Sequence, residues 1–190
     1  SILNRKVRFV KVDSPTSPGG SRWEVDALTP LVGGSGDKVS LAGISFFTLS
    51  VSIKLGELLY SFSSNELGDL YISRDSLPVF NAFSRVVAYV NVINNGPEYT
   101  DSTNVGEWVF LNYGKNRLKR GRRHLKDSGM FFDQIMNDNT HSGSIRIHGP
   151  GLAQMRGVFR TFIETIDLAT MYVSDGGYNT SVWSIPYSVE

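Results

Sequence analysis

The 190-residue sequence contains no cysteine, which excludes disulfide bonds, thiolate zinc sites and cysteine nucleophiles. Charged residues are sparse at 19%, while hydrophobic residues, at 41%, are as frequent as in an ordinary folded protein. The longest uncharged apolar-rich run, residues 39–53, is interrupted by serines and a glycine and is too short to span a bilayer. No signal segment is recognised at the start of the sequence, so we expect an intracellular protein.

Residue patterns typical of catalytic and metal sites are also missing. The three histidines, His124, His141 and His148, lack metal-ligand spacing, and no glycine-rich segment resembles a phosphate loop. No serine lies in a nucleophile-elbow sequence, and acidic residues such as Asp133 and Asp138 are scattered. The sequence therefore predicts a protein that is not an enzyme and has no cofactor, metal or small-molecule substrate.

Alternating apolar and polar residues predict several β-strands. The clearest alternation covers residues 46–55, where every second side chain is predicted to face the core: Phe47, Leu49, Val51, Ile53 and Leu55. Further strands are predicted at 84–93, 106–114, 143–149 and 180–190. In the last of these, Pro186 indicates an edge strand or a strand end.

Two segments are less regular. Residues 158–173 combine apolar residues near helical spacing with many β-branched side chains, and the β-branching favours a strand. Residues 74–83 predict a short helix with Asp75 or Ser76 as its cap and Pro78 in its first turn. Segments 14–20 and 33–37, rich in glycine, serine and proline, are interpreted as loops or extended arms.

Short strands joined by loops of uneven length predict an all-β fold in one domain. The expected architecture is a single antiparallel β-sandwich of about eight main strands, with short helices in the connections. Residues 1–38 are assigned to an extended N-terminal arm and loops, and residues 39–190 to the sandwich.

Positive charge is concentrated in the segment KNRLKRGRRHLKD, residues 115–127, in which Asp127 is the only acidic residue. The chain has 19 basic and 18 acidic residues, so 12 basic and 17 acidic residues remain outside this segment. Its cations are the predicted nucleic-acid-binding residues: Lys115, Arg117, Lys119, Arg120, Arg122, Arg123 and Lys126. A loop held by salt bridges to acidic neighbours is the plainer alternative. The segment lacks the apolar face of a membrane helix, since only Leu118 and Leu125 are apolar.

The three tryptophans, Trp23, Trp108 and Trp183, are candidates for stacking on bases or sugars. Each lies in an apolar alternation, however, so core packing is the favoured prediction for all three.

Three stretches share their order with elements of a viral fold. A helical turn leads into a strand at residues 77–92, a tryptophan opens the strand at 108–111, and a Gly-Pro follows a short strand at 145–150. In this order the sequence resembles the jelly-roll coat proteins of picorna-like viruses, closest to the small coat proteins of the comovirus group of plant viruses. The resemblance covers residues 40–190. The concentrated basic segment departs from that group, in which RNA-facing charge is more dispersed.

The resemblance implies a jelly-roll sandwich that acts as a viral capsid protein. Such a subunit self-associates into an icosahedral shell around the genome, expected to be RNA, and is found in the virion after assembly in the host cytoplasm. Its partners are other capsid subunits, identical or sibling, and the genome, with residues 1–20 ordered on neighbouring subunits and anchored by Phe9 and Trp23. Two alternatives stay open: a viral matrix or movement-type protein that binds nucleic acid or membrane through the basic segment, and a carbohydrate-binding β-sandwich.

Overall fold

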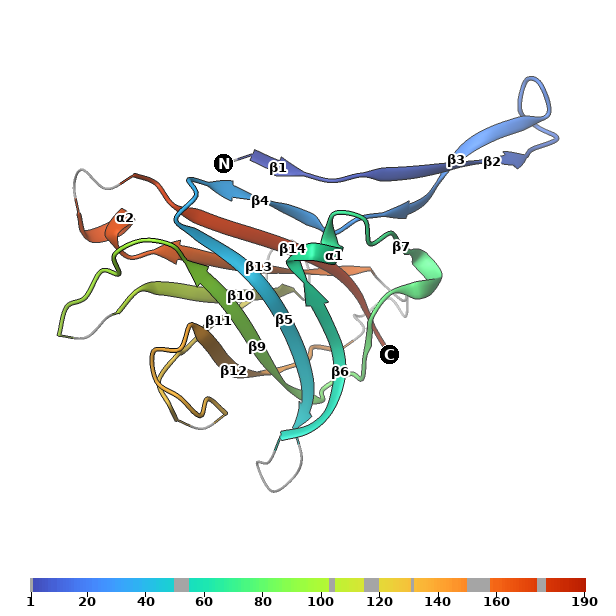
Figure 1. The fold of residues 1–190 in the computed structure, drawn as a ribbon. Helices are drawn as coiled ribbons and strands as arrows, with labels where there is room; N and C mark the ends of the chain where they lie inside the picture. The colour runs from blue at the N-terminus through green and yellow to red at the C-terminus, as the bar shows by residue number, and fades with distance from the viewer. Residues whose placement is uncertain are drawn as a thin grey trace.

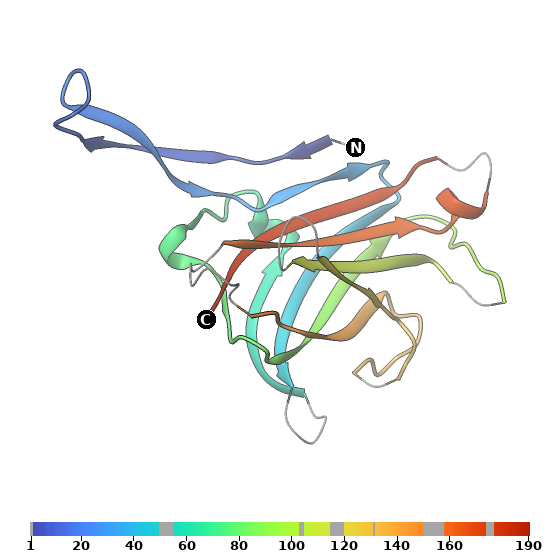
Figure 2. The ribbon, with the colours of Figure 1, turned by 180° about the vertical axis from the view of Figure 1, so that it is seen from behind.

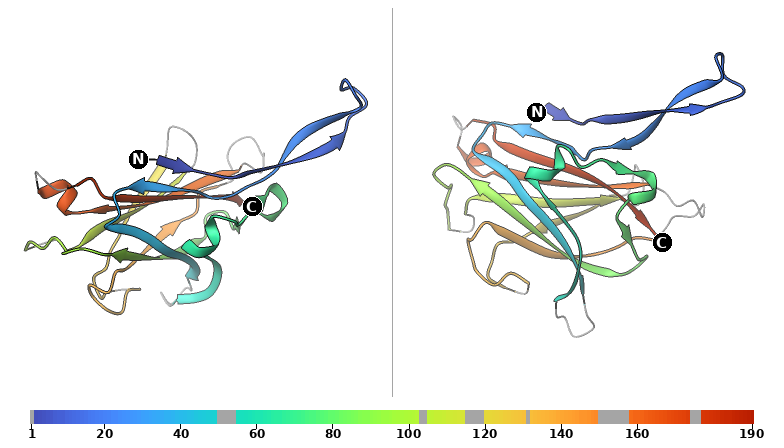
Figure 3. Two further views of the ribbon diagram at one scale, coloured as in Figure 1. Left: turned by 45° about the horizontal axis from the view of Figure 1, so that its top comes forward. Right: turned by 45° about the vertical axis from the view of Figure 1, so that its right-hand side comes forward.

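The computed structural model is an antiparallel β-sandwich from which a β-hairpin projects (Figure 1). The structure describes residues 2–49, 55–102, 105–114, 120–130, 132–149, 158–173 and 177–190. Two large sheets face each other, and a small third sheet forms the hairpin and its base (Figure 3).

The first sheet contains seven of the described strands. Its order is β1 (Ile2–Asn4), β4 (Leu31–Ser35), β14 (Thr180–Val189), β13 (Phe159–Asp167), β10 (Glu107–Gly114) and β11 (Arg120–Leu125). The seventh, β8 (Val79–Phe80), pairs in parallel with the end of β14.

The second sheet has the order β12 (Thr140–Arg146), β9 (Arg85–Asn94), β5 (Val39–Leu49) and β6 (Leu55–Ser63). The third sheet is formed by β2 (Val7–Asp13), β3 (Ser21–Leu28) and β7 (Ile72–Ser73). Among the described residues, helices are confined to single turns: α1 (Ser64–Leu67), the 3-10 turn η1 (Arg74–Ser76) and α2 (Ala169–Tyr172).

The hydrophobic core lies between the two large sheets. Ile44 and Val90 from the second sheet are buried in one cluster with Leu111, Ile163 and Ile185 from the first. Because side chains alternate between the faces of a strand, each strand contributes every second residue to this layer. The predicted antiparallel β-sandwich with short helices in its connections is thus confirmed.

The jelly-roll connectivity is not confirmed by the strand order. In the two large sheets, three pairs of consecutive described strands, β5–β6, β10–β11 and β13–β14, lie side by side. They occur in the fold as antiparallel hairpins, and jelly-roll topology stays a prediction from the resemblance.

The predicted strand over residues 46–55 is wrong in both extent and facing. Strand β5 ends at Leu49, and β6 begins at Leu55 and pairs back on it. Phe46 is buried at 3% exposure, whereas Phe47 is half-buried against the Tyr89 ring, and Leu55 is exposed. Irregular pairing with β6 on both sides of Phe47 breaks the simple alternation. Residues 50–54, which include Val51 and Ile53, lie outside the described residues.

The predicted helix at 74–83 reduces to the single turn η1. The Ser76 hydroxyl accepts a hydrogen bond from the Ser73 N–H at 3.0 Å, so the cap precedes the predicted Asp75 or Ser76. After this turn the chain becomes extended, because β8 pairs with β14 and the Pro78 carbonyl accepts the Ser188 N–H. Tertiary pairing therefore overrides the local helix signal.

The predicted strands at 84–93, 106–114 and 180–190 are confirmed as β9, β10 and β14, and the one at 143–149 falls partly on β12. In the ambiguous segment 158–173 the strand β13 covers residues 159–167, and α2 follows it. The preference for a strand over a helix is therefore confirmed for the first part of the segment.

Pro186 lies within β14, at a position where the edge of the strand that faces β4 and β8 is unpaired. The N–H groups of Ser188 and Glu190 face β8 and its flanks, so residue 186 points its nitrogen to the same side. Pairing with β4 ends at Ser184, and pairing with β8 begins at Ser188. Proline is tolerated here because no neighbouring strand needs a donor at this position.

Residues 1–38 contain more β-structure than an extended arm. The predicted loop at 14–20 is the turn of the β2–β3 hairpin, with Gly19 and Gly20 at positive φ. The predicted loop at 33–37 begins within β4, where Gly33 and Gly34 pass between β1 and β14. A Cβ on Gly34 would lie 2.0 Å from the Thr180 carbonyl oxygen, so this strand requires glycine.

Candidate functional site

The basic segment lies at the edge of the first sheet. Residues 120–125 form β11, which pairs with β10 over six residue pairs. Directly after β11, the backbones of Lys126 and Ser142 exchange two hydrogen bonds of 2.9 Å, which join this edge to β12 of the second sheet. Of the seven predicted cations, Lys115, Arg117 and Lys119 and the side chain of Arg120 lie outside the described residues.

The described cations of this segment are exposed but lie on opposite faces of the strand. The Arg122 guanidinium carbon lies 3.7 Å from the centre of the Phe110 ring on the outer face. The Arg123 side chain extends to β12, where a Cβ on Gly143 would lie 3.6 Å from its Nε. Among the described residues, Arg122, Arg123 and Lys126 form no ion pair with a carboxylate. The predicted salt-bridged loop is therefore not what the described part of this segment forms.

Aromatic rings continue outward from Arg122. The centre of the His124 ring lies 4.9 Å from that of Phe110 and 5.6 Å from that of Trp108. The ring centres of Trp108 and Tyr172 are 6.1 Å apart, in an edge-to-face arrangement. Trp108 is half-buried because Val109 and Leu111, its alternate neighbours, occupy the core side of β10. The prediction that every tryptophan packs in the core is therefore correct only for Trp183, since Trp23 is exposed.

His124 is held in a setting that disfavours its charged form. Burial, followed by the positive charges of Lys126 and its neighbours, lowers the pKa of His124 from 6.5 to about 4. The imidazole is therefore neutral at pH 7, and the positive charge of this edge comes from its arginines and lysines.

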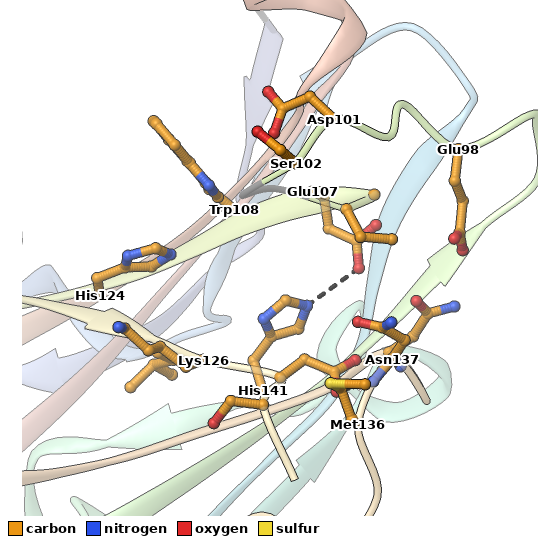
Figure 4. Close-up of a pocket in the computed structure, with 16 residues that line it drawn as sticks. Glu98, Asp101, Ser102, Glu107, Trp108, His124, Lys126, Met136, Asn137 and His141 are labelled. Atoms are coloured by element: carbon orange, nitrogen blue, oxygen red, sulfur yellow. Dashed lines mark hydrogen bonds and ion pairs between the residues drawn. The ribbon is translucent and has the colours of Figure 1, made fainter. Parts of the chain in front are cut away.

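A pocket opens beside β11, between the start of β10 and the chain that leads into β12 (Figure 4). His141 Nε2 donates a hydrogen bond of 3.0 Å to Glu107, whose other oxygen accepts from the Asn94 amide at 2.8 Å. Glu107 and His141 are 3% and 4% exposed, and the remaining ring nitrogen of His141, Nδ1, is buried with no hydrogen-bond partner. In Figure 4 this nitrogen points away from Glu107, on the side of the ring where Lys126 and His124 lie.

This buried dyad joins strands of both sheets, since Asn94 belongs to β9, Glu107 to β10 and His141 to β12. A carboxylate that orients an imidazole is also a component of general-base sites, which further require a nucleophile hydrogen-bonded to the free nitrogen. No described hydroxyl makes that bond. The hydrogen bonds among Asn94, Glu107 and His141 connect strands of the two sheets. Glu107 and His141 are 34 residues apart in the sequence, so no local pattern predicts that they meet.

Three acidic residues that look scattered in the sequence converge in the loop between β11 and β12. The carboxylates of Asp127, Asp133 and Asp138 lie within 4.8 Å of one another and offer oxygen ligands of the kind that hard cations prefer. Asp127 accepts the Asn137 and Asn139 N–H groups, and Asp133 accepts N–H groups of the same loop. Burial raises the pKa of Asp127. These bonds fix the loop that forms one wall of the pocket.

The β2–β3 hairpin projects from the sandwich and carries large apolar side chains (Figure 2). Phe9 pairs with Val25, and Trp23 pairs with Lys11, so the three apolar side chains share one face of the hairpin. Phe9 is 56% exposed, Trp23 68% and Val25 56%. This face of the hairpin thus carries three large apolar side chains together with the exposed Lys11, and no core lies beneath it.

Together these features define an antiparallel β-sandwich protein with a basic sheet edge and a projecting apolar hairpin. No protein-family model matches the chain, and no curated protein matches its sequence. Within the described residues, no helix has the length and apolar character needed to cross a membrane.

Proposed function

We propose that the chain is a viral coat protein, a structural subunit that self-associates into a shell and encloses nucleic acid. The observation that carries the proposal is the apolar face of the β2–β3 hairpin. An exposed hairpin of this kind is stabilised when a neighbouring subunit covers it, because large aromatic and aliphatic side chains anchor protein interfaces.

The charges of the hairpin support a second copy of the chain as its partner. Arg8 pairs with Asp26 at 2.5 Å, and Arg22 pairs with Glu24 at 2.5 Å, so these four charges are neutralised within the hairpin itself. Apart from the charge of Lys11, the attraction available on this face is then apolar, as in the interfaces of stable oligomers. Sparse charge in the whole chain suits a subunit that is covered on several sides.

The basic edge supplies the proposed contact with the genome. Its arginines lack carboxylate partners among the described residues, and Arg122 lies over an aromatic ring. Each lysine or arginine can neutralise one phosphate and release a counterion, without reading the base sequence. The aromatic rings beside Arg122 also favour the second candidate, a matrix or movement-type protein that binds nucleic acid without forming a shell.

The test is the assembly state of hairpin variants. Phe9→Ser combined with Trp23→Ser should convert assemblies into monomers with an unchanged circular dichroism spectrum, measured by light scattering after size exclusion. Val10→Ser is the matched control, because Val10 pairs with Glu24 and lies on the other face of the same hairpin. If the double variant and the control keep the wild-type assembly state, the hairpin is not the interface and the proposal fails.

Electron microscopy separates the two candidates. Closed shells support the coat protein, whereas sheets or filaments support the matrix or movement-type protein. Replacement of Arg117, Arg120, Arg122 and Arg123 by Gln should lower the nucleic-acid content of particles and flatten the salt dependence of binding. Unchanged content would place the segment on the outer surface, and lost assembly would place it at a subunit interface.

A further inference from the structure

A small cavity of about 250 Å³ lies at the base of the hairpin, where β3 and β7 meet the ends of β13 and β14. Three arginines line it: Arg5, Arg74 and Arg160. The rest of its wall is mainly apolar and includes Val25, Leu28, Ile72, Leu77, Val158 and Pro186. Three positively charged side chains thus surround a mainly apolar cavity at the base of the β2–β3 hairpin.

The Arg5 guanidinium has an unpaired donor atom in this cavity. Its Nε is buried and makes no hydrogen bond. Among the described residues no carboxylate lies within ion-pair distance of Arg5, Arg74 or Arg160. Asp26 lines the cavity, but its carboxylate is bound by the Arg8 Nε at 2.5 Å.

The local electrostatics also favour an anion. Burial, followed by the nearby positive charge of Arg160, lowers the pKa of Arg5. Both effects disfavour a cation, and an oxyanion bound between the two guanidinium groups would offset them through its opposite charge. A buried donor without an acceptor is unfavourable, so the unpaired Nε marks a position where an acceptor could bind.

The shape and lining of the cavity limit the chemical class of ligand that fits it. A planar guanidinium matches a carboxylate in a two-bond geometry, and the apolar wall favours an apolar group attached to it. The volume is below that of most drug-sized pockets, which start at about 300 Å³. We propose that this cavity binds a small organic carboxylate, whose oxygens contact Arg5 and Arg160 and whose apolar body packs against the wall formed by Ile72 and Leu77.

Calorimetric titration of the full chain tests the proposal with three probes. Benzoate should bind, benzamide, its neutral analogue of the same shape, should bind at least ten-fold more weakly, and inorganic phosphate should also be weaker than benzoate. Equal binding of benzoate and benzamide, or no binding of benzoate, would overturn the carboxylate site. Phosphate binding as tight as that of benzoate would overturn the role of the apolar wall.

Variants locate the binding event. Arg160 is exposed on β13, so the Arg160→Gln variant should fold normally. It should bind benzoate at least ten-fold more weakly than the wild type. Arg5→Gln should have the same effect, and Arg5→Lys should recover only part of the affinity. Arg146→Gln is the charge-matched control, because Arg146 is an exposed residue of β12 on the other sheet. Benzoate binding that is unchanged in Arg160→Gln and Arg5→Gln would refute the assignment.

The carboxylate could belong to a free molecule or to an acidic side chain of a second copy of the chain. We assign it to a free molecule, which predicts that saturating benzoate leaves the sedimentation of the assembled protein unchanged. Dissociation by benzoate but not by benzamide would overturn this assignment. Because the hairpin variants test assembly separately, the carboxylate site and the coat-protein proposal can fail independently.

Discussion

Replacement of His124 by Gln should make the stability of the protein less sensitive to acid. The pKa of His124 is about 4 in the folded protein and 6.5 in its ordinary state, so between these values the unfolded chain binds a proton that the folded chain does not. The contribution of neutral His124 is therefore complete above about pH 6.5 and is lost as the pH falls toward 4. Glutamine does not titrate, and it removes this dependence.

The size of the effect follows from the pKa difference. A difference of about 2.5 corresponds to about 3.4 kcal/mol at full burial, since one unit equals about 1.4 kcal/mol. His124 is only half-buried, so solvent screening reduces the expected loss to about 1–2 kcal/mol between pH 7 and pH 4.5.

The assay is urea unfolding of the wild type and the His124→Gln variant at several pH values from 4.5 to 7.5. The difference between their free energies of unfolding isolates His124, because the other titrating groups are shared by both proteins. This difference should be constant above pH 7 and should change by about 1–2 kcal/mol in favour of the variant toward pH 4.5. Parallel stability curves over the whole range would refute the assignment of a low pKa to His124.

Three further substitutions test the fold. Phe46→Asp should prevent folding, because it buries a carboxylate, whereas Phe47→Asp should reduce the melting temperature only moderately; equal effects would contradict the assigned face of β5. His141→Leu should lower the free energy of unfolding by about 1–3 kcal/mol in urea titrations at pH 7, because it removes one of the two hydrogen bonds to the buried Glu107 carboxylate, and an unchanged free energy of unfolding would show that this bond contributes little. Gly34→Ala should destabilise the first sheet, since its Cβ would lie 2.0 Å from a carbonyl oxygen of β14, and wild-type hydrogen-exchange protection along β14 would contradict this.

Local patterns in the sequence predicted the fold class and most of the strands. The apolar residues of segments 84–93 and 106–114 have the spacing typical of β-strands, and these segments form β9 and β10. The same reasoning failed at residues 46–55, because the alternation continues across the connection between β5 and β6 and contains no glycine or proline before Gly56. A period-two pattern does not reveal where the chain reverses or which face is buried, since a shift of one residue exchanges the two faces.

For the candidate sites, too, the sequence predicted some features and only the tertiary structure decided others. The composition of residues 115–127 by itself identified a concentration of positive charge, because charge is a property of the residues and not of their arrangement. Only the tertiary structure decided that part of this segment is an edge strand and that Arg122 lies over Phe110. It also brought together Glu107 with His141, and Arg5 with Arg160, which are far apart along the chain. Such pairs depend on strand order and register, which arise from the packing of the whole core and leave no local trace in the sequence.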